Sequence, residues 1–105
     1  MVKQGTIIVT DFNPTRGHEQ QKVRPALVVS NNDYNRFTGL VIVLPISHAK
    51  EFPTHIPLPD GYQTDGKVLC EHVRALDIEA RGYKEIETVE KEFLQHILDI
   101  CKMEF

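Results

Sequence analysis

Residues 14–24 gather side chains that could together bind an anion and move a proton. The segment reads PTRGHEQQKVR, and its polar side chains are those of Arg16, His18, Glu19, Gln20, Gln21, Lys22 and Arg24. A histidine exchanges a proton near pH 7, and an arginine can hold a phosphate through two hydrogen bonds. Long polar loops in small domains are often functional. The pattern indicates an anion-binding loop; a solvated surface loop is the alternative.

Arg24 stands at a distinctive place, directly before Pro25 and the apolar run PALVVS. Because proline restricts the preceding residue to extended conformations, the arginine side chain leaves a fixed backbone at the start of a core strand. Such a mounting favours a preorganised catalytic cation. The alternative is an ordinary salt bridge to an aspartate or glutamate.

Further candidates lie later in the chain. Ser47 ends the apolar run LVIVLPIS, where its hydroxyl could cap the turn or donate to a ligand oxygen. Residues 66–73 alternate like a strand, which predicts that Glu71 shares a face with Val73 while Cys70 shares the other with His72. Glu71 could transfer a proton or be a solvated outer position. Arg74 and Asp77 could simply pair with each other.

Other catalytic chemistries lack their motifs. The five histidines show no HxH or HExxH spacing, and neither cysteine has a CxxC partner, which argues against a metal site. A glycine-rich phosphate cradle and a GxSxG nucleophile elbow are also absent. The sequence therefore predicts chemistry carried by side chains without a cofactor.

Short strands separated by turns must position these residues. Strands are predicted over residues 5–12, 25–30, 40–47, 54–58, 66–73 and 83–87, with 54–58 as an edge and Pro25 at the start of its strand. Residues 31–37 predict one or two helical turns with Asn31 or Asn32 as N-cap. Thr88 is predicted to cap a C-terminal amphipathic helix. Together these elements predict a mainly β fold: a curled antiparallel barrel of five to seven strands with helical covers.

Composition bounds the class of protein. The chain has 105 residues with 41% apolar content, which predicts a single domain over 1–105. No apolar run reaches the roughly 18 residues of a membrane span, and the N-terminus does not resemble a secretory signal, so we expect a cytoplasmic protein. Cys70 and Cys101 are expected to be buried structural thiols. The net charge of −3 argues against a general nucleic-acid binder, although the basic loop could contact a few phosphates.

Taken in order, these segments resemble the MazF/PemK family of toxin endoribonucleases, and the GHEQQ and ARG pieces are closest to its Kid branch. The residues that match are Asp11, Phe12, Pro14, Gly17, Glu19, Gln20, Arg24, Pro25, Ser30 and Asn35, then Leu44 to Ser47 and Cys70 to Asp77. The resemblance covers nearly the whole chain. It implies an SH3-like barrel that pairs into a homodimer and cleaves single-stranded mRNA without a metal. The implied products carry a 2′,3′-cyclic phosphate and a 5′-hydroxyl.

The resemblance also implies roles and partners. Arg24 and Ser47 match two catalytic positions, His18 matches a histidine of the Kid branch, and Glu71 stands in place of an aspartate. The implied substrate-binding residues are Arg16, Glu19, Gln20, Lys22 and His72. An antitoxin with an acidic, disordered tail is the implied partner, with DNA binding by the toxin–antitoxin complex. Leu69 replaces an arginine of the Kid branch, so that mechanism does not carry over whole.

RNA cleavage agrees with the residues present. RNA carries its own nucleophile, the 2′-hydroxyl, so cleavage needs a base, an acid and a cation on the phosphate. Because one fold can serve several functions, a noncatalytic module that binds gyrase, as in the related CcdB fold, is the alternative. Such a module would not need Arg24 and Ser47.

Overall fold

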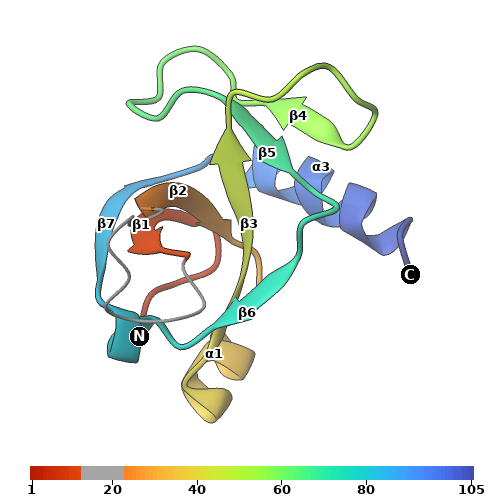
Figure 1. Ribbon diagram of the computed structural model, residues 1–105. Coiled ribbons are helices and arrows are strands. Elements are labelled where there is room, and N and C mark those ends of the chain that lie inside the picture. The colour runs from red at the N-terminus through yellow and green to blue at the C-terminus, as the bar shows by residue number, and fades with distance from the viewer. Residues whose placement is uncertain (13–22) are drawn as a thin grey trace.

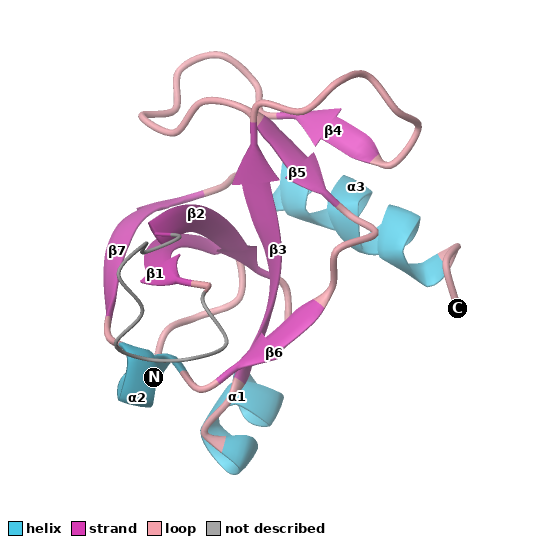
Figure 2. Ribbon diagram, in the orientation of Figure 1, coloured by secondary structure: helices cyan, strands magenta, loops and turns pink. Residues whose placement is uncertain are grey.

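The computed structural model describes residues 1–12 and 23–105, which form seven strands and three helices (Figures 1 and 2). In chain order the elements are β1 (Thr6–Asp11), β2 (Val23–Val28), α1 (Asn32–Thr38), β3 (Val41–Ser47), β4 (His55–Pro57), β5 (Lys67–Leu69), β6 (Arg74–Leu76), α2 (Ile78–Arg81), β7 (Tyr83–Thr88) and α3 (Lys91–Lys102). No helix among these residues is long and apolar enough to cross a membrane.

All seven strands belong to one antiparallel sheet that curls but does not close. Its order is β4-β5-β3-β2-β1-β7, and β6 pairs with β3 beside this path. β3 is central, because β2 follows one of its edges while β6 and β5 share the other (Figure 1). Within the described residues no pairing joins β4 to β7. The prediction of a mainly β, antiparallel, curled fold is confirmed, with β4 at the expected edge.

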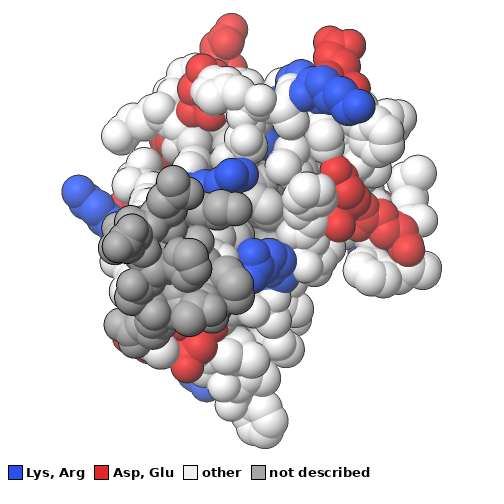
Figure 3. Space-filling view, in the orientation of Figure 1, with Lys and Arg blue, Asp and Glu red and all other residues white. Residues whose placement is uncertain are grey.

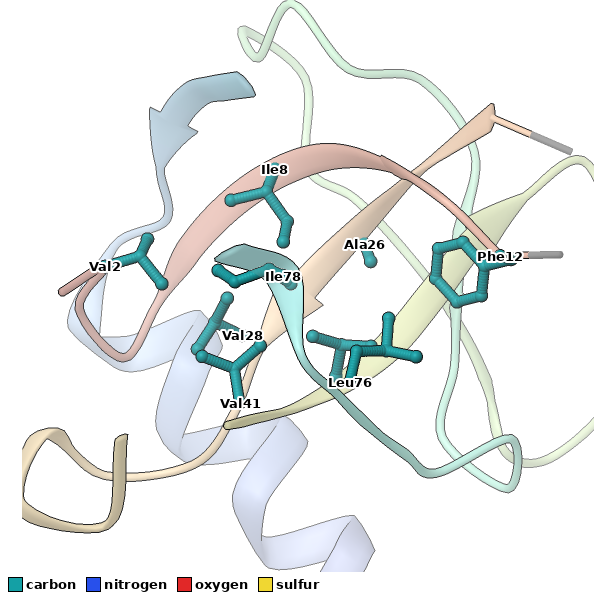
Figure 4. Close-up of a cluster of buried hydrophobic side chains, with 9 residues drawn as sticks. Val2, Ile8, Phe12, Ala26, Val28, Val41, Leu76 and Ile78 are labelled. Atoms are coloured by element: carbon teal, nitrogen blue, oxygen red, sulfur yellow. The ribbon is translucent and has the colours of Figure 1, made fainter. Parts of the chain in front are cut away.

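Two hydrophobic cores lie on opposite faces of this sheet. Successive side chains of a strand point to opposite faces, so Ala26 and Val28 enter the first core while Leu27 enters the second. The first core also contains Ile78 of α2 (Figure 4). The second is covered by α3, whose Ile97 is fully buried. Burial on both faces explains why the central strands are nearly continuous apolar runs.

The predicted strand over residues 66–73 is wrong, because only Lys67–Leu69 form a strand there and the next strand begins at Arg74. β5 ends at Leu69, Cys70 and Glu71 lie in a turn, and β6 begins at Arg74. Each strand pairs with a different part of β3, so the chain must turn between them. The strict alternation predicted for Glu71 and His72 therefore does not hold.

The helix ends show what local sequence could and could not predict. Asn31 caps α1 as predicted, since its side chain accepts a hydrogen bond from the Tyr34 amide, and Gly39 ends the helix at φ 73°. Sequence reasoning missed α2, which Asp77 caps by accepting from the Ala80 amide. Thr88 does not cap α3; it is the last residue of β7, and Glu90 takes the N-cap position without a side-chain bond.

Pro25 lies third in β2 rather than at its start, a second correction. Its partner in β1 is Val9, and the ladder to β3 begins at the next residue, Ala26, opposite Pro45. A proline has no N–H to donate. Pro25 lies in β2 before the pairing with β3 begins, so β2 can start at Val23, two residues earlier than expected.

Candidate functional site

Strand register pairs Ser47 of β3 with Lys67 of β5, and Arg24 lies in β2 two residues before the ladder to β3 begins. Ala26 lies opposite Pro45 in the last pair of the β2–β3 ladder, and the same register extended by two residues would set Arg24 opposite Ser47. Ser47 pairs in turn with Lys67. Directly opposite residues in antiparallel strands project on the same face. These three residues, which we call the cation row, would therefore place two positive charges on either side of a hydroxyl.

Arg24 and Ser47 keep their polar groups available. Arg24 is exposed and forms no ion pair with any residue of 1–12 or 23–105, so the salt-bridge alternative finds no support there. Ser47 is half-buried, and its hydroxyl makes no hydrogen bond to the described part of the chain. A guanidinium and a hydroxyl that have no partners among the described residues suit an anionic oxygen ligand.

Gly66 holds the backbone close to Ser47. It has φ 129°, and a Cβ built at this position would lie 3.0 Å from the Ser47 carbonyl oxygen. Residues that carry a side chain rarely adopt this φ, and the Ser47 carbonyl oxygen leaves too little space for a Cβ atom. Glycine is thus required here by both backbone conformation and space, and it sets the path of the chain into Lys67.

Lys67 is the site residue that sequence reasoning missed. Its ammonium donates to the Ala49 carbonyl oxygen at 2.9 Å and makes no salt bridge within the described residues. It lines a surface cavity of about 460 Å³ with Glu51, Phe52, Pro53, His55 and Pro57. Its position two residues before Leu69 was the available signal, because both lie on one face of β5. A cation, Lys67, therefore lies two residues along β5 from Leu69, the position at which the resemblance to the Kid branch would place an arginine.

Glu71 is held by three side chains from two neighbouring segments. Its carboxylate accepts a hydrogen bond from the Thr54 hydroxyl at 2.5 Å and lies 2.6 Å from His55 Nε2. His72 Nε2 lies 3.4 Å from the same carboxylate. Glu71 and His72 thus come together instead of pointing to opposite faces, and Glu71 is not simply a solvated outer residue. His55 was not predicted for the site, because its partner lies 16 residues away in sequence.

Other predicted features stand as follows. Arg74 does not pair with Asp77: its guanidinium lies 5.4 Å from the Phe12 ring centre and donates to the Phe12 carbonyl oxygen, while Asp77 caps α2.

Cys70 is buried as predicted, and burial together with Cys101 and Glu104 raises the pKa of its thiol to about 12. Cys101 is half-buried against the second core. Both cysteines are free, as structural thiols are.

The predicted loop residues lie outside the described residues. They are Arg16, His18, Glu19, Gln20 and Lys22. On the face shown in Figure 3, the described Lys and Arg side chains form separate groups interspersed with acidic ones. Among the described residues, no group of three or more His, Cys, Asp or Glu side chains is arranged to hold a metal ion. Any anion bound in this part of the molecule would be held by local groups such as the cation row.

The fold and the row of polar groups define a small antiparallel β protein with Ser47 and Lys67 side by side at one end of its central strand. Residues 3–102 match the family described as PemK-like, MazF-like toxin of type II toxin-antitoxin system, and the chain belongs to that family.

Named relatives and a solved structure agree with this membership. The chain is 34% identical over 102 residues to the endoribonuclease PemK of Escherichia coli, covering 92% of this chain and 77% of that protein. It is 38% identical over 94 residues to the endoribonuclease toxin MazF of Escherichia coli strain K12, covering 89% and 84%. The MazE–MazF structure from Deinococcus radiodurans matches with a TM-score of 0.87 and 32% identity, covering 98% and 94%.

Proposed function

We propose that this chain is the toxin of a type II toxin–antitoxin system and an endoribonuclease that cleaves single-stranded RNA. The observation that carries the proposal is the cation row, in which Lys67 pairs with Ser47 and the extended register of β2 would bring Arg24 to the other side of Ser47. Family membership and relatives named as endoribonucleases supply the substrate class. We take residues 1–105 to act as a single toxin domain.

In this proposal the row holds the scissile phosphate. Arg24 and Lys67 stabilise the negative charge that develops on the phosphate oxygens, and Ser47 donates a hydrogen bond to one of them. The 2′-hydroxyl attacks the phosphorus, so the P–O2′ bond forms while the P–O5′ bond breaks. The 2′-hydroxyl loses its proton to a base, and an acid supplies a proton to the leaving 5′-oxygen. The products are a 2′,3′-cyclic phosphate and a 5′-hydroxyl.

Glu71 and His18 are the proposed proton-transfer groups, since each matches a family position and both residue types can exchange a proton. Arg16, Glu19, Gln20, Lys22 and His72 are proposed to bind the RNA. No step requires a metal ion, because the two cations of the row supply the positive charge.

The decisive experiment incubates the purified protein with a long RNA in EDTA and maps both new ends. We expect cleavage at a short sequence with cyclic-phosphate and 5′-hydroxyl ends. Arg24→Ala should lower kcat by about a hundredfold or more, the cost of removing one charge-stabilising donor. Arg36→Ala is the matched control, because Arg36 is exposed on α1 and pairs with Asp33. Intact RNA across many sequences, or full activity in Arg24→Ala, would overturn the proposal.

We further propose a homodimer and an antitoxin partner. Two copies across a two-fold axis would lengthen the RNA groove, so light scattering should give the dimer mass at micromolar concentration. Solved relatives include a MazE–MazF complex. An acidic peptide of an antitoxin should compete with RNA for the basic residues Arg16, Lys22 and Arg24, and its binding should weaken with salt. Lys22→Glu should then weaken inhibition without changing the melting temperature.

A further inference from the structure

The carboxylate of Glu71 is fixed more firmly than a surface carboxylate needs to be. Thr54 donates to Oε1 at 2.5 Å, and His55 Nε2 lies 2.6 Å from Oε2. The His55 side chain is 10% exposed, whereas that of Glu71 is 32% exposed. The glutamate therefore reaches water on one side while a nearly buried ring holds it on the other.

The second ring nitrogen of His55 fixes its protonation. Nδ1 lies 2.9 Å from the Lys50 carbonyl oxygen, which can only accept a hydrogen bond. Nε2 faces a carboxylate, which also accepts when ionised. With Glu71 ionised, both nitrogens face acceptors, which favours the doubly protonated imidazolium ring. The bond to the Lys50 carbonyl raises the pKa of His55; burial opposes this, and Glu71 reinforces it.

The same contacts hold Glu71 in its charged form. Partial burial opposes ionisation, but hydrogen bonds from Thr54, the Glu71 amide and His55 outweigh it and lower the pKa of the carboxyl. His72 adds a further donor when it is protonated. Lys67 acts against the imidazolium by charge repulsion and so lowers the pKa of His55. Glu51 also lines the cavity that His55 and Lys67 share, and its carboxylate adds a negative charge there.

This cluster connects to the cation row through a shared cavity. His55 and Lys67 line the same cavity of about 460 Å³, and Lys67 pairs with Ser47. A ribose next to a phosphate on the row would lie within the region that the cluster borders. A carboxylate kept ionised there can take a proton, whereas the neutral acid could only give one.

We infer that His55 and Thr54 are positioning residues that hold Glu71 as the ionised base for the 2′-hydroxyl. The inference rests on the proposed RNA cleavage and deepens it, because it assigns the base to Glu71 and leaves the role of acid to another group. The 2′-hydroxyl proton passes to a Glu71 carboxylate oxygen as the P–O2′ bond forms. His55 touches neither substrate nor reacting atoms; it acts only through Glu71.

The test measures kcat against pH on an RNA oligonucleotide with one mapped cleavage site. In His55→Gln, loss of the positive charge should raise the Glu71 pKa. The acid limb of the kcat–pH profile should therefore move to higher pH by about half to one pH unit. Because the wild-type pKa of Glu71 lies below 4.5, kcat should change little at pH 6 and should fall about three- to tenfold at pH values below the wild-type pKa. Thr54→Val should move the limb in the same direction by less. His48→Gln is the matched control, because His48 is exposed and lies 3.7 Å from Asp65.

Two further readouts separate the possible outcomes. Affinity for the same oligonucleotide with a 2′-deoxy scissile nucleotide should change less than about threefold in His55→Gln, because a positioning role acts on proton transfer rather than on binding. NMR titration of wild-type His55 should show a pKa above the ordinary histidine value of about 6.5. An unmoved acid limb in an active, folded His55→Gln protein would overturn this inference alone. Failure of the wild type to cleave any RNA would instead overturn the proposed function.

Discussion

The two ends of β3 carry polar clusters of opposite character. At the beginning, next to α1, Asn35 is fully buried and donates to the carbonyl oxygens of Val2 and Ser30 at 3.3 Å each. Its side-chain oxygen also bonds the Ser30 hydroxyl, which accepts from the Ile42 amide. At the other end, Ser47 and Arg24 have no side-chain partner among the described residues, and the Lys67 ammonium donates only to the Ala49 carbonyl oxygen.

This difference separates groups that serve the fold from groups that can serve a ligand. A buried polar group must find partners inside the protein, or it costs free energy. A ligand-binding site must instead keep hydrogen-bond donors without protein partners, so that they can bind the substrate. Both Asn35 and Arg24 belong to the motifs that matched the toxin family, yet only Arg24 has capacity left for chemistry. We therefore expect mutations at the two ends to separate stability from activity.

The largest stability effect is expected at Asn35. Asn35→Ala removes one side chain that satisfies two carbonyls and a hydroxyl, which should lower the free energy of unfolding by about 2–3 kcal/mol. Urea unfolding followed by circular dichroism measures this change. Asn32→Ala on the same helix loses only an exposed bond to the Gln4 amide and should cost under about 1 kcal/mol. Activity per folded molecule should be unchanged in both, and a selective loss of cleavage would contradict the comparison.

A second prediction concerns Gly66, which combines both kinds of role. Gly66→Ala meets an unfavourable φ and a contact of 3.0 Å with the Ser47 carbonyl, so we expect a loss of about 1–3 kcal/mol in stability and reduced kcat. Gly61→Ala is the control, since Gly61 has φ 102° but nothing within 4 Å of the added carbon. Equal kcat values in the two variants would show that the contact with Ser47 does not matter.

The third prediction tests Lys67 as a phosphate contact. Lys67→Gln removes one positive charge from the cation row, and kcat/KM should fall about tenfold, which corresponds to about 1.4 kcal/mol. The slope of log affinity against log salt should also decrease by about one, since one phosphate contact is lost. Lys84→Gln serves as control, because Lys84 is exposed on β7, which pairs with β1. A parallel loss in both lysine variants would point to net charge rather than to the row.

The smallest effect is expected at Glu87, which anchors the segment that leads to β5. Its carboxylate accepts from the amides of Gln63 and Thr64 and from the Thr64 hydroxyl. Burial opposes ionisation, but these hydrogen bonds outweigh it and lower the pKa of Glu87 below its usual value of 4.5.

Because the folded-state pKa of Glu87 is the lower one, its contribution to stability is present above pH 4.5 and is lost as pH falls through the folded value. Glu87→Gln should therefore cost about 1 kcal/mol at pH 7 and progressively less in acid. Thermal melts at pH 7 and pH 3 measure the difference. A gap between variant and wild type that does not shrink in acid would contradict the assignment.

Much of the fold was predictable because its signals are local. Apolar runs marked the central strands, Asn31 and Gly39 marked the ends of α1, and the proline-interrupted segment marked the edge strand β4. The errors occurred where tertiary pairing overrode local pattern. Residues 66–73 alternate like one strand, but β5 and β6 pair with different parts of β3, so the strand ends at Leu69 and pairing resumes only at Arg74. The cap of α2 at Asp77 was a local signal that the alternation nearby obscured.

The sequence by itself determined which residues can carry the chemistry: Arg24 before a proline and Ser47 at the end of an apolar run stand out by type and neighbours alone. Tertiary structure decided which groups accompany them. Lys67 lies 20 residues after Ser47 and joins it only through strand register, and His55 meets Glu71 only because β4 pairs with β5. Hydrogen-bonded register depends on the packing of the whole sheet, so contacts of this kind leave no local pattern in the chain.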